Sequence, residues 1–348
     1  MTAAVDLPVE AYLAGIVGVP QVGPAQQREL LAEATPEEAW DRVRTRRGAA
    51  PDLEALWDRH LQAGVLVVSR SHPDYPEVLR DDPEPPTVLF CRGDLAALDR
   101  RRVGVVGTRN ATRYGLGVAE QLGARLGAAG VAAVSGLALG VDGAVHRGLL
   151  RAGGAPPIAV VGSGLDVVYP GRHRDLWAQV ASEGLLLSEL PLGMRPTRWS
   201  FPARNRIIAA LSEAVVVVES KQAGGSLYTA EEALLRDRPL LAVPGPITSP
   251  TARGTNRLIA DGATPMCAVD DVFVALELAS PAGAAHAREP GGYPGRVLDA
   301  CAHESVTLET LVLRSGLTLP EVVTAIDELC RTGWLAEVAG RYERTVGR

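Results

Sequence analysis

Lysine is almost absent from the 348-residue sequence, where Lys221 stands alone among 35 lysine and arginine residues. Cysteine is also scarce, and the cysteines lie far apart without a Cys-x-x-Cys pair, which excludes a disulfide framework and a zinc site. The six histidines are equally scattered, so we expect neither a metal centre nor a cofactor. We expect reduced thiols in a cytoplasmic protein, at Cys91, Cys267, Cys301 and Cys330.

Long hydrophobic runs are missing as well. The densest run, Ala214 to Val218, is far shorter than the ~20 apolar residues that span a bilayer. The first residues lack a basic segment followed by an apolar one, so we expect no secretory signal and no membrane partner. Hydrophobic residues make up 47% of the chain and charged residues 22%, which predicts a folded protein of two or three domains.

The net charge of −6 argues against a protein whose whole surface coats nucleic acid, but it allows a local basic strip. The basic residues are nearly all arginine, whose planar guanidinium suits phosphate oxygens and stacks on bases. Three arginine clusters stand out, the first and the third in stretches without carboxylates, and they gain meaning only if the fold brings them together. The clusters are Arg100, Arg101, Arg102, Arg109 and Arg113; Arg172, His173 and Arg174; and Arg195, Arg198, Arg204 and Arg206, interleaved with Trp199 and Phe201.

The first part of the chain, residues 1–60, predicts a small helical accessory domain. Helices are expected over 11–17, 25–34 and 37–44, with a Gly/Pro hairpin over 18–24. This order suits a helix-hairpin-helix module, also described as SAM-like. Several glutamates follow the hairpin, which favours a structural role over DNA contact.

The central part, residues 65–280, alternates short aliphatic strands with helical stretches, which predicts an α/β fold with a doubly wound, Rossmann-like parallel sheet. After an Ala/Gly/Pro-rich linker at 280–292, residues 292–348 predict three helices and a β-hairpin, the order of a winged helix. Thr318 and Glu321 fit a capping box at the start of the third of these helices. The expected strands are 103–106, 131–134, 158–161, 185–187, 215–218 and 240–243.

The ends of the predicted parallel strands carry small and polar residues. Because ligands bind beyond the carboxyl ends of such strands, we expect an anion site built from backbone amides and hydroxyls at this edge. A dinucleotide is excluded, since Gly107 is followed by Thr108 and Arg109 instead of a Gly-x-Gly-x-x-Gly turn. A P-loop motif is also absent. The strand-end residues include Gly107, Thr108, Ser135, Gly136, Gly162, Ser163, Gly164, Gly225 and Ser226.

A series of motifs in this region resembles the DNA-processing protein A (DprA/Smf) family, and the resemblance covers roughly residues 65–275 in the right order. The flanking modules also look like that family's accessory domains. The motifs are Val106-Gly-Thr-Arg109 with Tyr114-Gly115, Ser135-Gly-Leu-Ala-Leu-Gly-Val-Asp-Gly-Ala-Val-His146, Gly162-Ser-Gly-Leu-Asp166 with Tyr169-Pro170, Ser188-Glu189, Phe201-Pro-Ala-Arg-Asn-Arg206, Gly225-Ser-Leu-Tyr-Thr-Ala230, Val243-Pro-Gly245 and Gly254-Thr-Asn256.

The resemblance implies a protein that binds single-stranded DNA without catalysis. It implies a homodimer formed through the Rossmann-like domain, protection of incoming DNA, and loading of a RecA-type recombinase in natural transformation. Single-strand-binding protein is implied as a further partner.

By this resemblance and the charge pattern, Arg109 contacts phosphate, Arg198 lies beside the strand, and Phe201 stacks on a base. Of Arg204 and Arg206, one is expected to face DNA and the other to pair internally. Further contacts are expected from the strand-end residues named above, Arg172 and Asn256.

Two alternatives stay open. The stretch Gly224 to Glu232 loosely resembles the phosphate loop of nucleoside-monophosphate phosphoribohydrolases, with Glu231 or Glu232 as the acid. A regulator that binds duplex DNA through the winged helix is the other, although the carboxylates of its third helix count against it. Asp142 and His146 lie four residues apart on an expected helix, and we interpret them as an ion pair or a cap that fixes the loop at 135–140.

Overall fold

The computed structural model describes residues 7–19, 22–47, 50–278, 290–301 and 305–344. The chain divides into two compact units, Met1–Glu277 and Leu278–Arg348. The helical region expected over residues 1–60 therefore lies in the same unit as the sheet. Part of the expected hairpin at 18–24 and most of the expected linker at 280–292 fall outside the described residues.

One sheet dominates the first unit, and in the described residues it has the strand order β1-β2-β6-β5-β4-β3-β7-β8-β9. All six expected strands are present. They are aliphatic runs buried on both faces, as is typical of the central strands of a parallel sheet. The sequence analysis missed β1, β2 and β9. The bounds are β1 Leu66–Ser69, β2 Val88–Gly93, β3 Arg102–Val106, β4 Ala132–Ser135, β5 Ile158–Val160, β6 Leu185–Ser188, β7 Ala214–Val217, β8 Leu240–Ala242 and β9 Thr264–Pro265.

In the order of the sheet, the seven strands β6-β5-β4-β3-β7-β8-β9 run parallel. The other two pair antiparallel, β2 with β6 and β1 with β2. The chain builds outward from β3 through β4 and β5 to β6, then returns to place β7 on the other side of β3. This reversal makes the sheet doubly wound and Rossmann-like, as the sequence predicts. Loops after β3, β4 and β5 therefore emerge side by side at one edge.

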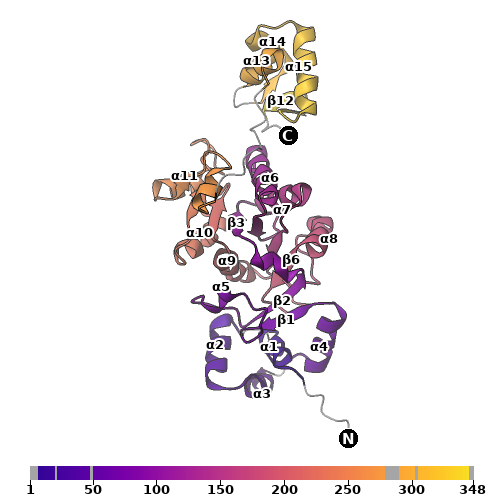
Figure 1. Cartoon of the computed structure of the whole chain (residues 1–348), viewed down its shortest axis with the longest axis vertical. Coiled ribbons are helices and arrows are strands. Elements are labelled where there is room, and N and C mark those ends of the chain that lie inside the picture. Colours follow the sequence, from indigo (N-terminus) through magenta and orange to yellow (C-terminus); the bar gives the residue numbers. More distant parts are fainter. Residues whose placement is uncertain (1–6, 20–21, 48–49, 279–289, 302–304, 345–348) are drawn as a thin grey trace. The chain divides into compact units, whose positions relative to one another are not determined.

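Helices cover both faces of the parallel strands (Figure 1). On one face lie α6 (Arg113–Ala128), α7 (Val141–Ala152) and α8 (Arg174–Glu183). On the other lie α9 (Ser200–Leu211) and α10 (Ser226–Leu234). No helix among the described residues is long and apolar enough to cross a membrane. After β1 the unit also contains α5 (Glu77–Arg80), the 3-10 turns Leu95–Asp99 and Gly171–His173, α11 (Arg253–Ala260) and α12 (Asp271–Ala275).

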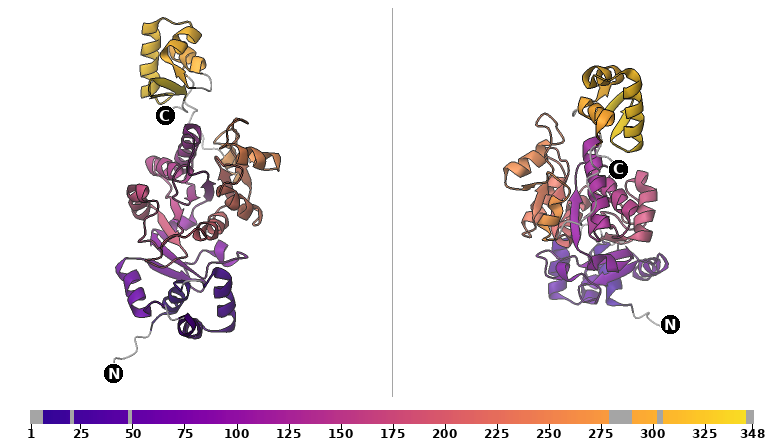
Figure 2. Two further views of the ribbon diagram at one scale, coloured as in Figure 1. Left: turned by 180° about the vertical axis from the view of Figure 1, so that it is seen from behind. Right: turned by 45° about the horizontal axis from the view of Figure 1, so that its top comes forward.

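Four N-terminal helices lie at the β1–β2 end of the sheet, as both views in Figure 2 show. The first and the fourth of them contact these strands. The expected helices are α1 (Val9–Val17), α2 (Pro24–Glu33) and α3 (Pro36–Arg47). The fourth, α4 (Leu53–Gln62), was not predicted. Asp52 caps it by accepting a hydrogen bond from the Ala55 amide.

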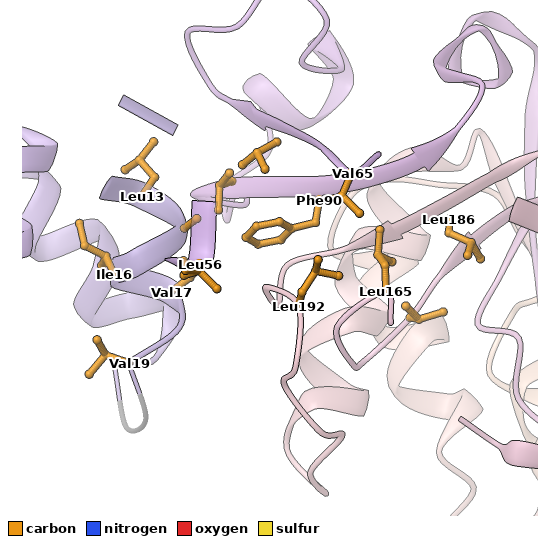
Figure 3. Close-up of a cluster of buried hydrophobic side chains, with 14 of the residues drawn as sticks. Leu13, Ile16, Val17, Val19, Leu56, Val65, Phe90, Leu165, Leu186 and Leu192 are labelled. Carbon is orange, nitrogen blue, oxygen red and sulfur yellow. The ribbon is translucent and has the colours of Figure 1, made fainter. Parts of the chain in front are cut away.

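The N-terminal helices and the sheet share one hydrophobic core around Phe90 (Figure 3). Leu13, Ile16 and Leu56 approach it from the helices, and Leu165 and Leu192 from loops of the sheet. His60 connects the helices to the sheet. Its ring centroid lies 4.9 Å from that of Phe90, and its Nε2 is 3.1 Å from the Leu192 amide nitrogen. Burial lowers the pKa of His60, so its neutral ring accepts this hydrogen bond.

The second unit has its own core and a small sheet in the order β10-β12-β11. Thr318 and Glu321 form the expected capping box at the start of α15, with the Thr318 amide 2.8 Å from Glu321 Oε2. Its elements are α13 (Gly292–Cys301), β10 (Val306–Thr307), α14 (Leu308–Ser315), α15 (Leu319–Arg331), β11 (Leu335–Val338) and β12 (Arg341–Arg344).

Candidate functional site

The loops after β3, β4 and β5 meet the start of α9 in a small pocket of about 50 Å³. The pocket unites residues that lie far apart in the sequence, and half of its lining was expected from the sequence. Those residues are Arg109, Gly136, Gly162, Ser163, Phe201 and Arg204. The rest of the lining comprises Ala138, Leu139, Val161, Tyr169, Pro170 and Pro196.

An arginine and two aromatic rings form the mouth of the pocket. The Arg109 guanidinium carbon lies 4.7 Å from the centroid of the Phe201 ring. The Tyr169 ring also contacts the Phe201 ring, and the two ring centroids lie 5.6 Å apart. Arg109 is exposed, and among the described residues it forms no ion pair. Cation–π contact thus orients a positive charge that stays available to an anion.

A second guanidinium forms the inner wall. Arg204 is 7% exposed, and its Nη1 donates to the Val160 carbonyl at 2.6 Å. Burial lowers the pKa of Arg204 to about 10 despite the attraction of Asp142, so the side chain remains charged at pH 7. Of the two arginines on α9 that the sequence could not separate, Arg204 is the one at the pocket.

Gly136 makes room for this arginine. A Cβ atom there would lie 1.6 Å from Arg204 Nη1, so only glycine lets the guanidinium cross this loop. The next residue, Leu137, is fully buried with φ at 54°, a conformation that a leucine rarely adopts. The loop is therefore held in one shape by its surroundings.

The Asp142 side chain fixes the same loop after β4 through hydrogen bonds. Its Oδ2 accepts hydrogen bonds from the amides of Gly136 at 3.1 Å and Ala138 at 3.4 Å, which confirms the expected cap. The expected ion pair with His146 does not form. His146 is fully buried, and neither ring nitrogen has a hydrogen-bond partner within the described part of the chain. Burial, with repulsion from His173, lowers the pKa of His146 to about 3, so the ring is neutral at pH 7.

Arg206 belongs to the structural framework. It forms an ion pair with Glu189, and its Nη1 donates to the Glu84 carbonyl at 2.6 Å. Its side chain is 5% exposed, so it ties the segment around Glu84 to α9. Arg206 is therefore the arginine that pairs internally, as we expected of one of the two. Its place among the DNA-contacting residues is corrected.

The expected serine hydroxyls also turn inward. Ser135 is fully buried and donates to the Val105 carbonyl, while Ser163 donates to the Val167 carbonyl. Ser226 donates to the Ser220 hydroxyl at 2.9 Å. These bonds fix the loops, because a buried hydroxyl must find a partner inside the protein. The hydroxyl contacts that we expected from the three serines are therefore corrected.

Other expected residues lie around the pocket instead of in it. The Gly225 carbonyl accepts a hydrogen bond from Asn205 of α9, which joins the start of α10 to the pocket's helix. Arg198 is exposed and lies 4.6 Å from the Trp199 ring centroid. Arg172 is exposed, two residues after Pro170 in the chain.

Four expected residues serve the packing of neighbouring loops. The Thr108 amide donates to the Glu219 carbonyl at 2.7 Å, and a Cβ on Gly107 would meet Val141. The Asn256 side chain makes two hydrogen bonds with Gly245: its oxygen accepts from the Gly245 amide, and its nitrogen donates to the Gly245 carbonyl. Gly164 packs against Pro191 in the same way, with no room for a Cβ. These positions shape the edge of the sheet without lining the pocket.

The sequence analysis missed the role of Tyr169, although the Tyr169-Pro170 pair was singled out as a motif. The position of the pair directly after the Gly162 loop was the available signal. No pattern in the sequence indicated that the Glu219 side chain, after β7, packs against the start of α6. Its carboxylate accepts from the amide and hydroxyl of Thr112, at 2.8 and 2.6 Å.

One of the two acids of the phosphoribohydrolase alternative is engaged in an ion pair. Glu232 forms an ion pair with Arg236, which also binds the buried Asp82. Glu231 is exposed on α10, where no described histidine, cysteine or acidic side chain completes a metal-binding group of three. None of the residues 224–232 lines the pocket described above.

Comparisons with known proteins agree with this architecture. Residues 66–277 match the family model described as DNA recombination-mediator protein A. The chain is 39% identical to DNA processing protein DprA of Bacillus subtilis over 65% of its own length and 76% of the relative. It is 36% identical to a putative DNA processing protein DprA of Mycobacterium tuberculosis strain H37Rv, over 97% of this chain and 92% of the relative.

Two solved structures are also similar. DNA processing protein A of Streptococcus pneumoniae superposes with a TM-score of 0.60 at 30% identity, over 76% of this chain and 95% of the other. DNA processing protein A of Helicobacter pylori, studied for its single-stranded DNA binding mode, gives 0.55 at 30% identity, over 61% and 95%. The resemblance seen in the motifs is confirmed, and the chain belongs to the DNA recombination-mediator protein A family.

Proposed function

We propose that this protein binds single-stranded DNA at the Arg109–Phe201 pocket. The observation that carries the proposal is the Arg109 guanidinium over the Phe201 ring, 4.7 Å away, beside the Gly136 and Gly162 loops. A phosphate suits the exposed guanidinium and the nearby backbone, and a base suits the aromatic surface. Membership of a DNA-processing family and the Helicobacter pylori relative support this assignment.

Unpaired DNA fits this mouth better than a duplex. Stacking on Phe201 or Tyr169 requires a base whose face is open, and such stacking contributes about 1–3 kcal/mol per base. The cavity beneath is too small for a whole base, so the base lies on the rings and the phosphate reaches toward Arg109. Arg204 adds a fixed positive charge at the inner wall of the pocket.

The exposed residues before α9 extend the proposed contact surface. Arg195, Arg198 and Trp199 are all exposed, and Trp199 is 69% exposed. They would follow the strand as it leaves the pocket, with Arg172 on the neighbouring loop. Gly225 at the start of α10 offers an approach for the backbone, since a Cβ added there would meet nothing within 4 Å.

Family membership supports a larger role. We propose that the protein coats and protects incoming single strands as a homodimer, and then loads a RecA-type recombinase in natural transformation and recombination. Displacement of single-strand-binding protein belongs to the same step. No catalytic step is part of the proposal.

We also propose that the second unit is a winged helix that contacts protein instead of DNA, and that α1–α3 form a helix-hairpin-helix or SAM-like accessory domain. The helix–strand–helix–helix–hairpin order supports the first assignment. Exposed Asp327 and Glu328 on α15 would repel phosphates, and Arg331 is the basic residue of that helix.

Competition binding tests the proposed function. We expect a fluorescent oligothymidine to be displaced by unlabelled single strands and poorly by duplex of the same sequence. Incubation with AMP is expected to release no ribose 5-phosphate. Preferential displacement by duplex, or turnover of AMP, would contradict the proposal.

A further inference from the structure

The loop between β3 and α6, residues 107–112, carries Arg109 to the mouth of the DNA site. The Arg109 side chain is exposed, and its guanidinium carbon lies 4.7 Å from the centroid of the Phe201 ring. A cation–π contact is weak at an exposed site, so this one forms only if the backbone of the loop already places Arg109 beside the ring. The groups that fix this backbone therefore control the site.

Both ends of the loop are held by Glu219, which lies just after the end of β7. At the first end, the Thr108 amide donates to the Glu219 carbonyl at 2.7 Å. At the other end, the amide and the hydroxyl of Thr112 donate to the Glu219 carboxylate at 2.8 and 2.6 Å. Arg109 lies between these two anchors, so one residue that follows another strand sets the path of the loop.

The Glu219 carboxylate is itself confined to one place. The residue is 5% exposed, and the Thr251 hydroxyl adds a longer hydrogen bond to the carboxylate at 3.4 Å. In the first turn of α6, a Cβ on Gly115 would lie 2.5 Å from the carboxylate, so only glycine leaves it room. A buried carboxylate needs hydrogen-bond donors around it. The carboxylate and the start of α6 therefore fix each other.

The opposite side of the loop packs against the residues that precede and begin α7. A Cβ on Gly140 would lie 2.2 Å from the Thr108 carbonyl oxygen and 2.8 Å from the Arg109 carbonyl oxygen. The Val141 amide reaches the Thr108 carbonyl at 3.4 Å, which is long for a hydrogen bond. These contacts reach the carbonyls of residues 108 and 109, whereas the anchor at Thr112, where the loop enters α6, comes from Glu219.

We propose that Glu219 is a positioning residue for single-stranded DNA, because it fixes the loop at Thr108 and Thr112 and so keeps Arg109 over the Phe201 ring. Glu219 does not line the pocket, and its buried carboxylate does not meet the strand. Its effect on DNA therefore passes through Arg109. The inference rests on the proposed function of this pocket, so its test must separate a failure of Glu219 from a failure of the site.

A double-mutant cycle on the full-length protein makes this separation. We expect Glu219→Ala to weaken binding of a fluorescent oligothymidine about tenfold, but to change affinity less than about twofold when Arg109→Ala is already present. An equal loss in both backgrounds, or no loss in the wild-type background, overturns the inference while the DNA site stands. If Arg109→Ala alone leaves affinity unchanged, the proposed function fails and the inference fails with it. Should Glu219→Ala not fold, Thr112→Ala removes one donor to the carboxylate, and the same cycle should show a smaller loss that again depends on Arg109.

Glu213→Ala is the matched control, because Glu213 lies just before β7 as Glu219 lies just after it. The Glu213 carboxylate accepts from the Arg102 amide at 2.9 Å, at the start of β3, and pairs with Arg101. We expect both alanine variants to unfold at lower urea concentration than the wild type, but only Glu219→Ala to lose DNA affinity. Glu219→Gln can still form hydrogen bonds with Thr112, so it should recover most of the affinity lost in Glu219→Ala. Equal affinity losses in Glu213→Ala and Glu219→Ala, or no recovery in Glu219→Gln, overturn the proposal.

Discussion

The Arg109 guanidinium lies over the Phe201 ring at 4.7 Å, although one residue follows β3 and the other begins α9. The ring holds the guanidinium without neutralising it, because the contact uses the π face and leaves the N–H groups open. A nearby carboxylate would orient the arginine equally well but would cancel its charge. This pairing therefore explains how an acidic protein keeps a local site for an anion.

Replacement of this arginine should reduce DNA affinity without affecting folding. We expect Arg109→Ala to weaken binding of an oligothymidine about 10- to 100-fold, the range for loss of a charged hydrogen bond. The slope of log affinity against log salt should become less negative by about 0.7, the contribution of one phosphate contact on a single strand. Fluorescence anisotropy across salt concentrations measures both quantities.

The control for this experiment is Arg257→Ala. Arg257 is an exposed arginine of α11 that pairs with Asp261, so its removal should leave affinity and salt slope nearly unchanged. Equal losses in the two variants would mean that general surface charge, and not the pocket, attracts DNA.

A single methyl group in the loop after β4 should disturb the inner wall. In Gly136→Ala the new Cβ would overlap Arg204 Nη1, so Arg204 must leave the Val160 carbonyl. We expect a loss of about 1–3 kcal/mol in the free energy of unfolding, as for other overpacked sites, together with weaker DNA binding. Urea denaturation and anisotropy report the two effects.

Gly171→Ala provides the comparison, because nothing lies within 4 Å of a Cβ at that exposed glycine. Its stability should match that of the wild type. If Gly136→Ala behaved like Gly171→Ala in both assays, the position assigned to Arg204 would be wrong.

Stability should fall with acid because of His146. Its pKa is about 3 in the folded protein and near 6.5 when unfolded, so the unfolded state binds more protons between these values. This contribution is complete above pH 6.5 and is lost as the pH falls toward 3. Between pH 7 and pH 5 we expect His146 to account for a loss of about 2 kcal/mol in the free energy of unfolding.

Urea denaturation of the wild type and His146→Leu at both pH values isolates this contribution. The variant should lose about 2 kcal/mol less than the wild type on acidification. Parallel curves for wild type and His146→Leu would show that this histidine is not buried in its neutral form.

Removal of the second unit should leave DNA affinity intact. The chain 1–277 retains every residue of the pocket and forms a compact unit. Because the exposed carboxylates of α15 oppose phosphate, we expect the truncated and full-length proteins to bind oligothymidine within about twofold of each other. A large loss on truncation would assign DNA contact to the second unit.

The sheet could be predicted from the sequence because its central strands are aliphatic runs buried on both faces. Of the missed strands, β9 is two exposed residues and β1 begins with an exposed leucine. The third, β2, is buried over its first four residues, but it pairs antiparallel and precedes the alternation of strands and helices that identified the others. Helix α4 had a usable signal, since Asp52 caps it and Leu56 and His60 are buried four residues apart. Its end is fixed by His60 and Phe90, a contact that no local pattern encodes.

The site could be predicted in part, because the carboxyl ends of parallel strands must meet at one edge. The direction of each side chain could not. Arg204 and Arg206 lie on the same helix, and only the position of Glu189 on a distant loop makes Arg206 internal. The inward turn of Ser135 and Ser163 likewise depends on which backbone carbonyls lie beneath them.

Photocrosslinking tests the central claim most directly. An oligothymidine that carries 5-iododeoxyuridine is irradiated with the full-length protein, and the modified peptides are mapped by mass spectrometry. We predict crosslinks on Phe201 or Tyr169, the rings that contact each other at the mouth of the pocket, and their disappearance in Arg109→Ala. Crosslinks confined to α15 or to the N-terminal helices would contradict the account.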